Sequence, residues 1–356
     1  MTVFLVILVI LLFLVAVWQI KRIFQLAQTK VVGPAEIATD KDNNNQGYLM
    51  LGFLAFIYIL TILSFWFWWD TLLPDAGSEH GSQIDNLMLI SMALIFFVGI
   101  VTQGVLHYFA FIYRGNKVER ATFYADNDKL EFIWTIIPVI TLAGLIIYGL
   151  FTWTDIMNVD KDDDPLIVEL YAQQFNWKVR YGGNDNTLGE ANVRLIKGIN
   201  VLGVDPADPN GQDDKVVTEM HLPVGRKVLI KMRSQDVLHS AYMPHFRAQM
   251  NTVPGMITQF ALTPSVTTAD MRLTDYVINK VGNINEIRRA KSEELQAIGD
   301  EPLEPYEFDY LLLCNKICGI SHYNMQMKII VESEEDYQAW LAEQPTLADQ
   351  LSKENE

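Results

Sequence analysis

Two cysteines, a histidine and a methionine lie within twelve residues near the end of the chain. The segment is LLLCNKICGISHYNMQM, with the spacing Cys-x3-Cys-x3-His-x2-Met from Cys314 and Cys318 to His322 and Met325. These are the chain's two cysteines. Thiolate, imidazole and thioether are soft donors, and together they are typical of copper sites that transfer electrons. The segment therefore predicts a redox metal centre.

Two other chemistries fit part of this pattern. Cysteines four positions apart can form a disulfide in an oxidising compartment, and thiolates with a histidine can hold zinc. The methionine argues against zinc because a thioether is a poor zinc ligand. Histidine and methionine at these offsets, on a loop between two strand-like runs, also argue against a plain disulfide. Copper is the favoured interpretation.

A loop between strands needs a further ligand from elsewhere, and the chain has six histidines. His239 directly follows an alternating strand pattern, so we expect it at a strand end beside the loop. We expect His245, which lies beyond Pro244, at the surface or at an interface. The other three lie in an outside loop, in an apolar span and before a Pro-Gly turn: His80, His107 and His221.

Four apolar stretches are long enough to cross a membrane, for which about 20 residues suffice. They are residues 3–20, 48–69, 87–112 and 131–153. The second ends in the aromatic run Phe65 to Trp69, which fits the interfacial belt. The sequence therefore predicts a four-helix membrane anchor, followed by a domain of roughly 200 residues that can bury one core.

Basic residues orient these spans. The connections 21–47 and 113–130 carry Lys21, Arg22, Lys30 and Lys41, and Arg114, Lys117, Arg120 and Lys129, whereas 70–86 carries only acidic charges. The positive-inside rule places both basic connections in the cytoplasm and everything after residue 153 outside. Because Lys21 and Arg22 follow the first apolar stretch, we expect residues 1–20 to be a retained helix and not a cleaved signal peptide.

The predicted outer part is acidic and rich in strand patterns. Residues 154–356 contain 32 Asp and Glu against 19 Lys and Arg, a net charge of −13 that suits a basic soluble partner or plain solubility. Alternation in VELYAQQFNWKVRY, RKVLIKMRS and MQMKIIVES predicts an all-β sandwich. Two polar insertions interrupt it, at about 182–218 and 266–305, and the second contains a predicted helix, NEIRRAKSEELQAIG.

These residues together resemble subunit II of the haem–copper cytochrome c oxidases. DVLHS, then PGM, then CNKICGISHYNM matches the family's binuclear copper-A pattern in order and type, and LEFIWTIIP resembles its second membrane helix. The resemblance covers about residues 87–332 apart from the insertions. It implies a cupredoxin-like sandwich at 154–340, a membrane hairpin at 76–153, two extra membrane helices at 1–75 and an acidic tail at 341–356.

The resemblance also implies the ligand set of two copper ions. Cys314 and Cys318 would each bridge both ions, and His239 and His322 would each bind one. Met325 would be a weaker ligand of one copper, with the backbone carbonyl of Lys316 as its counterpart on the other. Asp236 matches a family acidic residue near the copper site, where it would orient ligands or meet the electron donor.

Three positions concern neighbouring functions of the family. The family usually has Glu at the position of Lys316, and that Glu helps to bind magnesium against subunit I, so the lysine puts magnesium in doubt. The residue through which electrons arrive is a Trp in the family; the matching position is Phe175, with Trp177 two residues on. Glu131 matches a carboxylate at the mouth of a proton pathway, or is a solvated helix-start residue.

The sequence thus predicts an electron-transfer subunit of a proton-pumping terminal oxidase. Electrons would pass from a c-type cytochrome, or a haem domain of a neighbouring respiratory complex, to haem a in subunit I, where oxygen is reduced. We expect a multi-pass protein of the bacterial plasma membrane with the copper domain on the periplasmic side. Its partners would be subunit I, other oxidase subunits and membrane lipid, with no nucleic acid. The two extra helices would pack against extra subunits or another respiratory complex.

Two rival interpretations make different predictions. A membrane-anchored copper chaperone or thiol redox protein also uses Cys-x3-Cys and a distant histidine, but it predicts a thioredoxin-like βαβ pattern around the cysteines. A quinol oxidase subunit II is a structural relative without the copper ligands. The pattern Cys-x-x-Cys-His of a fused cytochrome c domain does not occur in the sequence.

Overall fold

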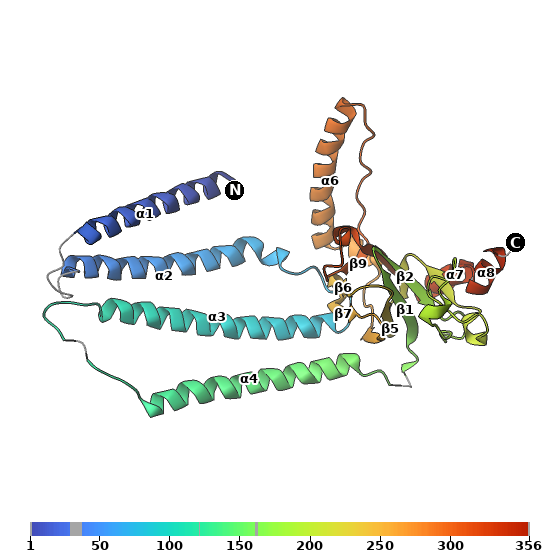
Figure 1. Cartoon of the computed structure of the whole chain (residues 1–356), viewed down its shortest axis with the longest axis horizontal. Helices are drawn as coiled ribbons and strands as arrows, with labels where there is room; N and C mark the ends of the chain where they lie inside the picture. The colour runs from blue at the N-terminus through green and yellow to red at the C-terminus, as the bar shows by residue number, and fades with distance from the viewer. Residues whose placement is uncertain (1, 29–37, 121, 161–162, 355–356) are drawn as a thin grey trace. The chain divides into compact units, whose positions relative to one another are not determined.

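Four long apolar helices precede a β-domain in the computed structural model (Figure 1), which describes residues 2–28, 38–120, 122–160 and 163–354. The helices are α1 (Thr2–Gln28), α2 (Asp40–Trp68), α3 (Gly81–Ile112) and α4 (Asp128–Met157). Each is long and apolar enough to cross a membrane. The four predicted spans are therefore confirmed as helices. Lys30 and the last two residues of the predicted acidic tail lie outside the described residues.

The chain divides into two compact units, and the division runs through the long helices. One comprises Met1–Phe67 and Ala93–Ile133, and the other Trp68–Met92 and Trp134–Glu356. In the first unit α2 packs along α3: the Tyr58 hydroxyl donates to the Ile100 carbonyl at 2.5 Å, and Arg114 donates to the Asn44 side chain at 2.6 Å. α2, the second of the two extra helices, thus contacts another helix of the same chain. That the extra helices bind further subunits stays a prediction.

The second unit contains a sandwich of two five-stranded sheets, with orders β3-β2-β1-β5-β8 and β4-β10-β9-β6-β7. The strands are β1 (Leu166–Gln173), β2 (Asn176–Tyr181), β3 (Lys215–Val217), β4 (Met220–Pro223), β5 (Val228–Ser234), β6 (His239–Met243), β7 (Ala248–Thr252), β8 (Thr258–Leu262), β9 (Tyr310–Cys314) and β10 (Gln326–Glu332). This arrangement confirms the predicted fold class of membrane helices followed by an all-β sandwich.

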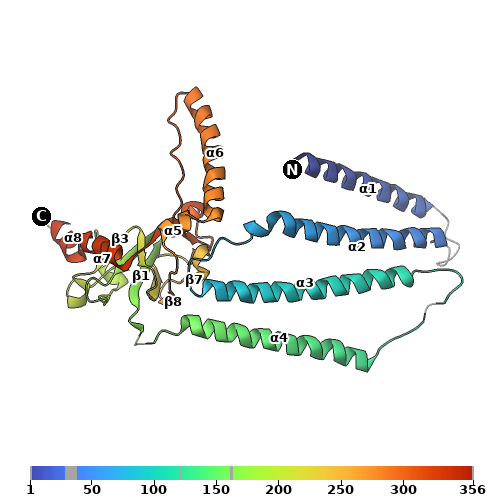
Figure 2. The ribbon, with the colours of Figure 1, turned by 180° about the vertical axis from the view of Figure 1, so that it is seen from behind.

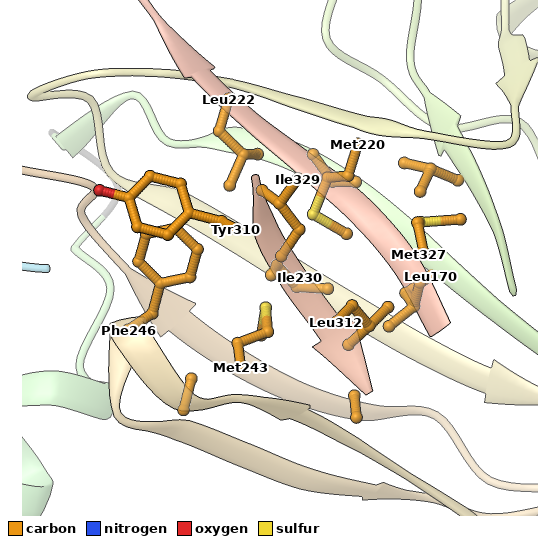
Figure 3. Packing of buried hydrophobic residues seen from close by; sticks show 14 of the residues in the cluster. Leu170, Met220, Leu222, Ile230, Met243, Phe246, Tyr310, Leu312, Met327 and Ile329 are labelled. Atoms are coloured by element: carbon orange, nitrogen blue, oxygen red, sulfur yellow. The ribbon is translucent and has the colours of Figure 1, made fainter. Parts of the chain in front are cut away.

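The alternating patterns read from the sequence become the buried faces of the strands. Along β5 the side chains of Val228, Ile230 and Met232 are buried while the residues between them are partly exposed. On β10 the buried residues include Met327 and Ile329. Both sets meet between the sheets in one apolar core (Figure 3). Burying such side chains is the main force that holds two sheets together.

One alternating run forms two strands where the sequence suggested one. VELYAQQFNWKVRY bends back on itself, and β1 and β2 pair antiparallel with Gln173 opposite Asn176. Gln174 and Phe175 are the two residues of the turn. A tight hairpin keeps alternation on both of its arms, so the side-chain pattern alone does not reveal it. The turn brings Phe175 to the end of the sandwich.

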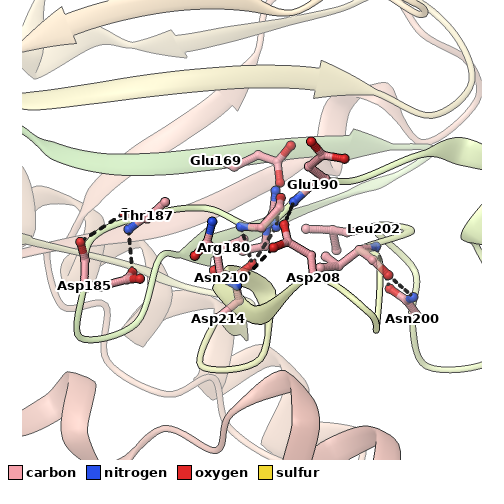
Figure 4. Close-up of polar contacts among 12 residues, drawn as sticks. Glu169, Arg180, Asp185, Thr187, Glu190, Asn200, Leu202, Asp208, Asn210 and Asp214 are labelled. Carbon is pink, nitrogen blue, oxygen red and sulfur yellow. Dashed lines mark hydrogen bonds and ion pairs between the residues drawn. The ribbon is translucent and has the colours of Figure 1, made fainter.

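The insertion at 182–218 is tied to the sheets by buried charges (Figure 4). Arg180 of β2 donates to Glu169 of β1 and to Asp214 of the insertion, at 2.6 Å in both cases. The same guanidinium donates to the Gly189 carbonyl at 2.9 Å. Because Arg180 and both carboxylates are buried, losing one partner would leave an uncompensated charge inside the protein, which is strongly destabilising. The insertion also contains 3₁₀ turns at Val193–Leu195 and Pro209–Gly211.

The insertion at 266–305 contains two helices, α5 (Thr268–Arg272) and α6 (Asp275–Ala297). Thr274 caps α6 by accepting a hydrogen bond from the Val277 amide. The helix stands away from the sheets, and the chain returns beside it (Figure 2). Asn285 exchanges hydrogen bonds with the backbone of Tyr306 at 2.7 and 3.1 Å. The predicted helix is confirmed, and its N-terminus lies upstream of the predicted segment.

Two short helices close the chain, α7 (Glu334–Glu343) and α8 (Leu347–Glu354). Ser333 caps α7, whose first turn is acidic. Trp340 of α7 stacks on the ring of His221 from β4, with centroids 3.8 Å apart. α7 runs across residues 340 and 341, the predicted boundary between the sandwich and the tail, and its Leu341 is part of the core.

The segment before α3 docks onto the β-domain. The Gly77 amide donates to the His245 carbonyl at 2.7 Å, and the Glu79 amide donates to the Thr263 carbonyl at 3.0 Å. Arg247 donates to both carboxylate oxygens of Asp85, at 2.7 and 2.9 Å, in the first turns of α3. A bidentate, partly buried pair of this kind fixes orientation as well as distance. The start of α3 is thereby held against the sandwich.

Of the two expectations for His245, the surface location is wrong, and a location at an interface stays a prediction. Its side chain is buried, and its ring lies edge-on to Phe308 and Tyr310 with centroids 5.2 and 5.3 Å away. Burial, with the nearby charges of Lys280 and Arg247, lowers the pKa of His245 from 6.5 to about 4. The hydrophobic neighbours come from distant parts of the sequence, so the local pattern after Pro244 does not indicate this burial.

His245 makes the stability of the β-domain pH-dependent. In the unfolded chain the histidine takes up a proton below its ordinary pKa, whereas the folded protein resists this until about pH 4. The folded state therefore loses up to about 3 kcal/mol as the pH falls from 7 to 4. Denaturant unfolding of wild type and His245→Phe, followed by tryptophan fluorescence across this range, measures it. Equal pH slopes for the two proteins would contradict the prediction.

Candidate metal centre

The candidate ligands are brought together by neighbouring strands of one sheet. β9 ends at Cys314 and β10 begins at Gln326, and the loop between them closes where the Cys314 amide donates to the Met325 carbonyl at 3.0 Å. β6 pairs with β9, placing Ala241 opposite Cys314. His239, the first residue of β6, therefore lies beside this loop although 75 positions separate it from Cys314. We call residues 314–325 the donor loop.

Six potential donor atoms converge here. The Cys314 and Cys318 sulfurs are 3.9 Å apart. Beside Cys314 lie the His239 Nδ1 at 3.8 Å and the Lys316 carbonyl oxygen at 3.3 Å. Beside Cys318 lie the His322 Nδ1 at 3.6 Å and the Met325 Sδ at 3.8 Å. Two central sulfurs with one nitrogen and one weaker donor beside each form a symmetric set.

The donor chemistry and the spacing fit two soft metal ions better than one. Thiolates and imidazoles suit copper, and a thioether sulfur adds a further soft donor. Each sulfur has its own nitrogen neighbour, so two ions can share both sulfurs and still find one imidazole each. The structure brings His239, Cys314 and Cys318 into one group of potential ligands. Their role as metal ligands stays a prediction, as does that of the other three donors.

The tautomer of His239 is fixed by Asp236. The carboxylate oxygen Oδ1 lies 2.9 Å from the His239 Nε2, while Nδ1 faces Cys314. A proton on Nε2 leaves the lone pair of Nδ1 for a metal, which is the usual arrangement behind a ligating histidine. Burial of Asp236 opposes its charge, but hydrogen bonds from the Gln174 amide, His239 and Val237 outweigh it and lower the pKa of the carboxyl. Two roles were predicted for Asp236, orienting the ligands or meeting the electron donor. The hydrogen bond to His239 fits the orienting role.

The Cys318 thiol is protonated at neutral pH without a metal. Burial first, and then the neighbouring Cys314, raise its pKa from 9.0 to about 11. Metals bind the thiolate, so binding an ion here displaces a proton. A raised pKa of the Cys318 thiol is thus compatible with a metal site, because the charge of the ion favours the thiolate.

The other predicted site residues are placed as follows. Trp177 is buried, and its ring lies edge-on to His239 with centroids 6.0 Å apart. Phe175 is half-buried at the turn before β2, beside Gly319 of the donor loop. Glu131 is exposed in the first turn of α4, in the compact unit that does not contain the donor loop. Gln174 was not singled out from the sequence, although its amide groups contact both Asp236 and the donor loop.

The donor loop lies at the surface and not in a substrate cavity. Ile317, Ile320 and Tyr323 are 86%, 89% and 87% exposed. A cavity of about 690 Å³ lies elsewhere, between the ends of α3 and α4 and the β4–β5 turn, and includes His80, Asp155 and Arg226 in its wall. None of the six candidate donors lines it. A metal centre in an exposed loop suits exchange of electrons with another protein.

Comparison with known proteins finds one family. The family model of the cytochrome c oxidase subunit II transmembrane domain matches residues 66–151. The alternative cytochrome c oxidase subunit 2 of Bradyrhizobium diazoefficiens is 32% identical over 283 residues, which are 79% of this chain and 85% of the relative. The cytochrome c oxidase subunit 2 of Thermostichus vulcanus is 24% identical over 316 residues, 82% of this chain and 84% of that protein.

Solved structures give weaker matches. The periplasmic domain of subunit II of cytochrome oxidase from Bradyrhizobium japonicum aligns with a TM-score of 0.28 and 17% identity, covering 50% of this chain and 91% of that domain. A chain of a heme-copper terminal oxidase dimer aligns with a TM-score of 0.31 and 18% identity, covering 58% and 99%.

The side chain of Lys316 is exposed, and its carbonyl oxygen is the atom that faces Cys314. We therefore expect Lys316→Ala to leave copper uptake unchanged, because the main chain keeps its donor. Copper per chain after dialysis, determined by atomic absorption, measures this. Cys314→Ser is the matched positive control, since it removes a donor atom two positions away. Loss of copper from Lys316→Ala would show that the side chain is needed.

Proposed function

The chain belongs to the cytochrome c oxidase subunit II family, and from this premise we propose that its β-domain holds a binuclear copper centre that relays electrons. The electrons come from a c-type cytochrome or a haem domain of a neighbouring complex, and they pass to haem a in subunit I. Oxygen reduction, coupled to proton pumping, takes place in that subunit. The chain is thus a component of a terminal haem–copper oxidase.

One observation carries this proposal: six donor atoms from two segments 75 positions apart converge around two sulfurs. A structural disulfide needs none of the four flanking donors. Cys314 and Cys318, with the four flanking donors, would hold the copper, which would supply one-electron transfer. The protein's part is to hold the donors rigidly so that little rearrangement accompanies the transfer.

Strand pairing, core packing and hydrogen bonds within the chain hold the donor atoms in place. The donor loop connects β9 to β10. These two strands pair antiparallel, with Leu312 opposite Met327. Both residues belong to the apolar core. Asp236 is hydrogen-bonded to the His239 Nε2. The buried ring of Trp177 packs edge-on against the His239 ring. Close-packed cores of this kind resist small displacements.

The proposed path of the electron begins at the turn between β1 and β2. Phe175 is half-buried there, and its ring lies against Gly319, the residue after Cys318. Its exposed edge suits contact with a partner protein, whereas Trp177 is buried behind it. The acidic balance of residues 154–356 would attract a basic cytochrome to the domain as a whole. His322, whose Nδ1 lies 3.6 Å from the Cys318 sulfur, is the proposed exit toward haem a.

The rival of a copper chaperone predicted a βαβ pattern around the cysteines. Cys314 instead ends an antiparallel strand of a sandwich, and the connection from β9 to β10 contains a single 3₁₀ turn, His322–Asn324, in place of the α-helix of a βαβ unit. A quinol oxidase subunit II has no copper ligands, so this alternative does not explain why the six donor atoms converge. Both rivals therefore account for fewer of the observations than the copper-A proposal does.

Partners and orientation follow from the same proposal. The chain is a multi-pass membrane protein, and we place its β-domain on the periplasmic side of a bacterial plasma membrane because the basic connections lie at the other ends of the spans. Subunit I and lipid would cover the apolar helices. Magnesium at the subunit I interface stays in doubt because the exposed side chain of Lys316 is a cation. A proton-path role for Glu131 also stays a proposal.

Copper loading of the full chain in detergent tests the proposal directly. We expect two coppers per chain and an electron paramagnetic resonance spectrum with the hyperfine pattern of one electron shared over both ions. Cys318→Ser abolishes that pattern, whereas Asn315→Ser, which introduces the same residue at an exposed neighbouring position, retains it. A single-copper spectrum, or a Cys314–Cys318 disulfide without metal, would refute the proposed centre.

Truncating Phe175 tests where the donor binds. We expect Phe175→Ala to raise the KM for a c-type cytochrome by about tenfold in the assembled oxidase, because removing an interface aromatic costs on the order of 1 kcal/mol or more. Phe175→Trp keeps an aromatic surface and should retain the wild-type KM. Steady-state oxidation of reduced cytochrome measures both. An unchanged KM in Phe175→Ala would place the donor elsewhere on the domain.

A further inference from the structure

The turn between β1 and β2 is bonded to the donor loop. The side-chain amide of Gln174 donates to the carbonyl oxygen of Cys318. Its backbone N–H donates to the Asp236 Oδ2 at 2.8 Å. The other oxygen of Asp236 is the one that faces His239. One residue of the turn is therefore linked to both halves of the candidate metal centre.

The loop has few other ties at this place. Its ends are held by the Cys314–Met325 backbone bond and by the Asn315 amide, which donates to the Ser240 carbonyl at 3.0 Å. Its last turn is held internally, by the His322 amide donating to the Gly319 carbonyl. Within the part of the chain that the structure describes, the bond from Gln174 is the hydrogen bond that ties residues 316–321 to a residue outside the loop.

Gly319 lets the turn approach this closely. Its φ of +139° is a backbone conformation that favours glycine. A Cβ atom at this position would lie 2.9 Å from the Gln174 Nε2 and 2.9 Å from two carbons of the Phe175 ring. Such contacts are too short to be tolerated without a shift of the turn or the loop. The side chains of Gln174 and Phe175 thus pack directly against the main chain of the loop.

We propose that Gln174 is a positioning residue for the metal centre, which clamps the Cys318 side of the donor loop and, through Asp236, the His239 side. This inference rests on the proposed function for its purpose but concerns the metal-free chain as well. The clamp holds the two thiols 3.9 Å apart and reduced, so that the donors are arranged before an ion arrives. A disulfide requires the sulfurs at about 2.05 Å.

The clamp also explains why a surface glutamine sits at the turn. Gln174 is exposed, so packing does not demand it, and many residues would suit a two-residue hairpin turn better. A long side chain with a terminal N–H donor is what reaches the Cys318 carbonyl. Because Phe175 is the next residue, the same bond fixes the ring proposed to meet the electron donor against the loop that holds the metal.

Gln174→Met removes the side-chain donor while keeping the length of the side chain and the backbone N–H to Asp236. In the metal-free, reduced full chain in detergent we expect the amides of residues 315–321 to exchange hydrogen about fivefold faster, which is what the net loss of one hydrogen bond corresponds to. Gln173→Met is the matched control, one position earlier, where no side-chain hydrogen bond is seen among the described residues. Equal exchange in wild type and Gln174→Met would overturn the proposal.

A thiol–disulfide titration gives a readout that general stability does not move. Glutathione disulfide oxidises the two thiols to the Cys314–Cys318 disulfide with loss of two protons, and is itself reduced to two molecules of glutathione. We expect Gln174→Met to be oxidised at a glutathione disulfide concentration about fivefold lower than wild type and Gln173→Met, because the clamp no longer opposes closure. A midpoint equal to that of wild type would refute a positioning role.

Gly319→Ala keeps the proposal falsifiable if Gln174→Met does not fold. The added methyl pushes on the same contact from the loop side, and we expect the same faster exchange in residues 315–321. Unchanged exchange in this variant would contradict the clamp. The two proposals also fail separately: if wild type never binds two coppers, the electron-relay function falls, while the exchange and oxidation differences between Gln174→Met and Gln173→Met still decide the clamp.

Discussion

The pairing of β6 with β9 is the constraint on which the rest of the site depends. Ala241 lies opposite Cys314, and this register places the first residue of β6 beside the last residue of β9. A slip by one residue would turn His239 to the other face of the sheet, since side chains alternate along a strand. The register is held by the core, because Ala241 and Leu312 are both fully buried. The chemistry of the donor loop is thus set by hydrophobic packing several residues away.

Much of this arrangement could be predicted from local sequence. The four spans follow from length and composition, and the alternation in β5 and β10 follows from the two-residue period of a strand. The donors could be identified because their residue types and spacing are rare in combination. The β1–β2 turn could not, since both of its arms alternate. The burial of His245 depends on Phe308 and Tyr310, which follow it by more than sixty positions, and the contact of Gln174 with Cys318 spans 144 positions. Such contacts are decided by tertiary packing.

Hydrogen bonds tie the sandwich to the segment that leads into α3 and to the start of that helix. Arg247, which follows the buried turn at His245, is paired with Asp85 near the start of α3 and also donates to the Pro74 carbonyl at 2.6 Å. Ser78 donates to the Phe246 carbonyl at 2.8 Å from within this segment. Since β6, which contributes His239, runs directly into the turn that Arg247 terminates, the same stretch of backbone bears a candidate ligand at one end and the tie to α3 at the other. The position of the donor loop relative to the start of α3 is therefore defined by short, specific contacts.

At Lys316 and Gly319 of the donor loop, the main chain makes the contact with the neighbouring residues. Lys316 faces Cys314 with its carbonyl oxygen, so a substitution of its side chain leaves that donor in place and alters only what the exposed side chain can bind. Phe175 packs against Gly319, whose lack of a side chain makes the contact possible. This contact needs a flat ring at position 175, and it does not need the indole N–H that a tryptophan would supply. At His239, Cys314 and Cys318 a side-chain atom is itself the donor, and no other residue offers the same atom at the same reach. Side-chain identity is therefore constrained most strongly where the side chain, and not the backbone, faces the proposed metal.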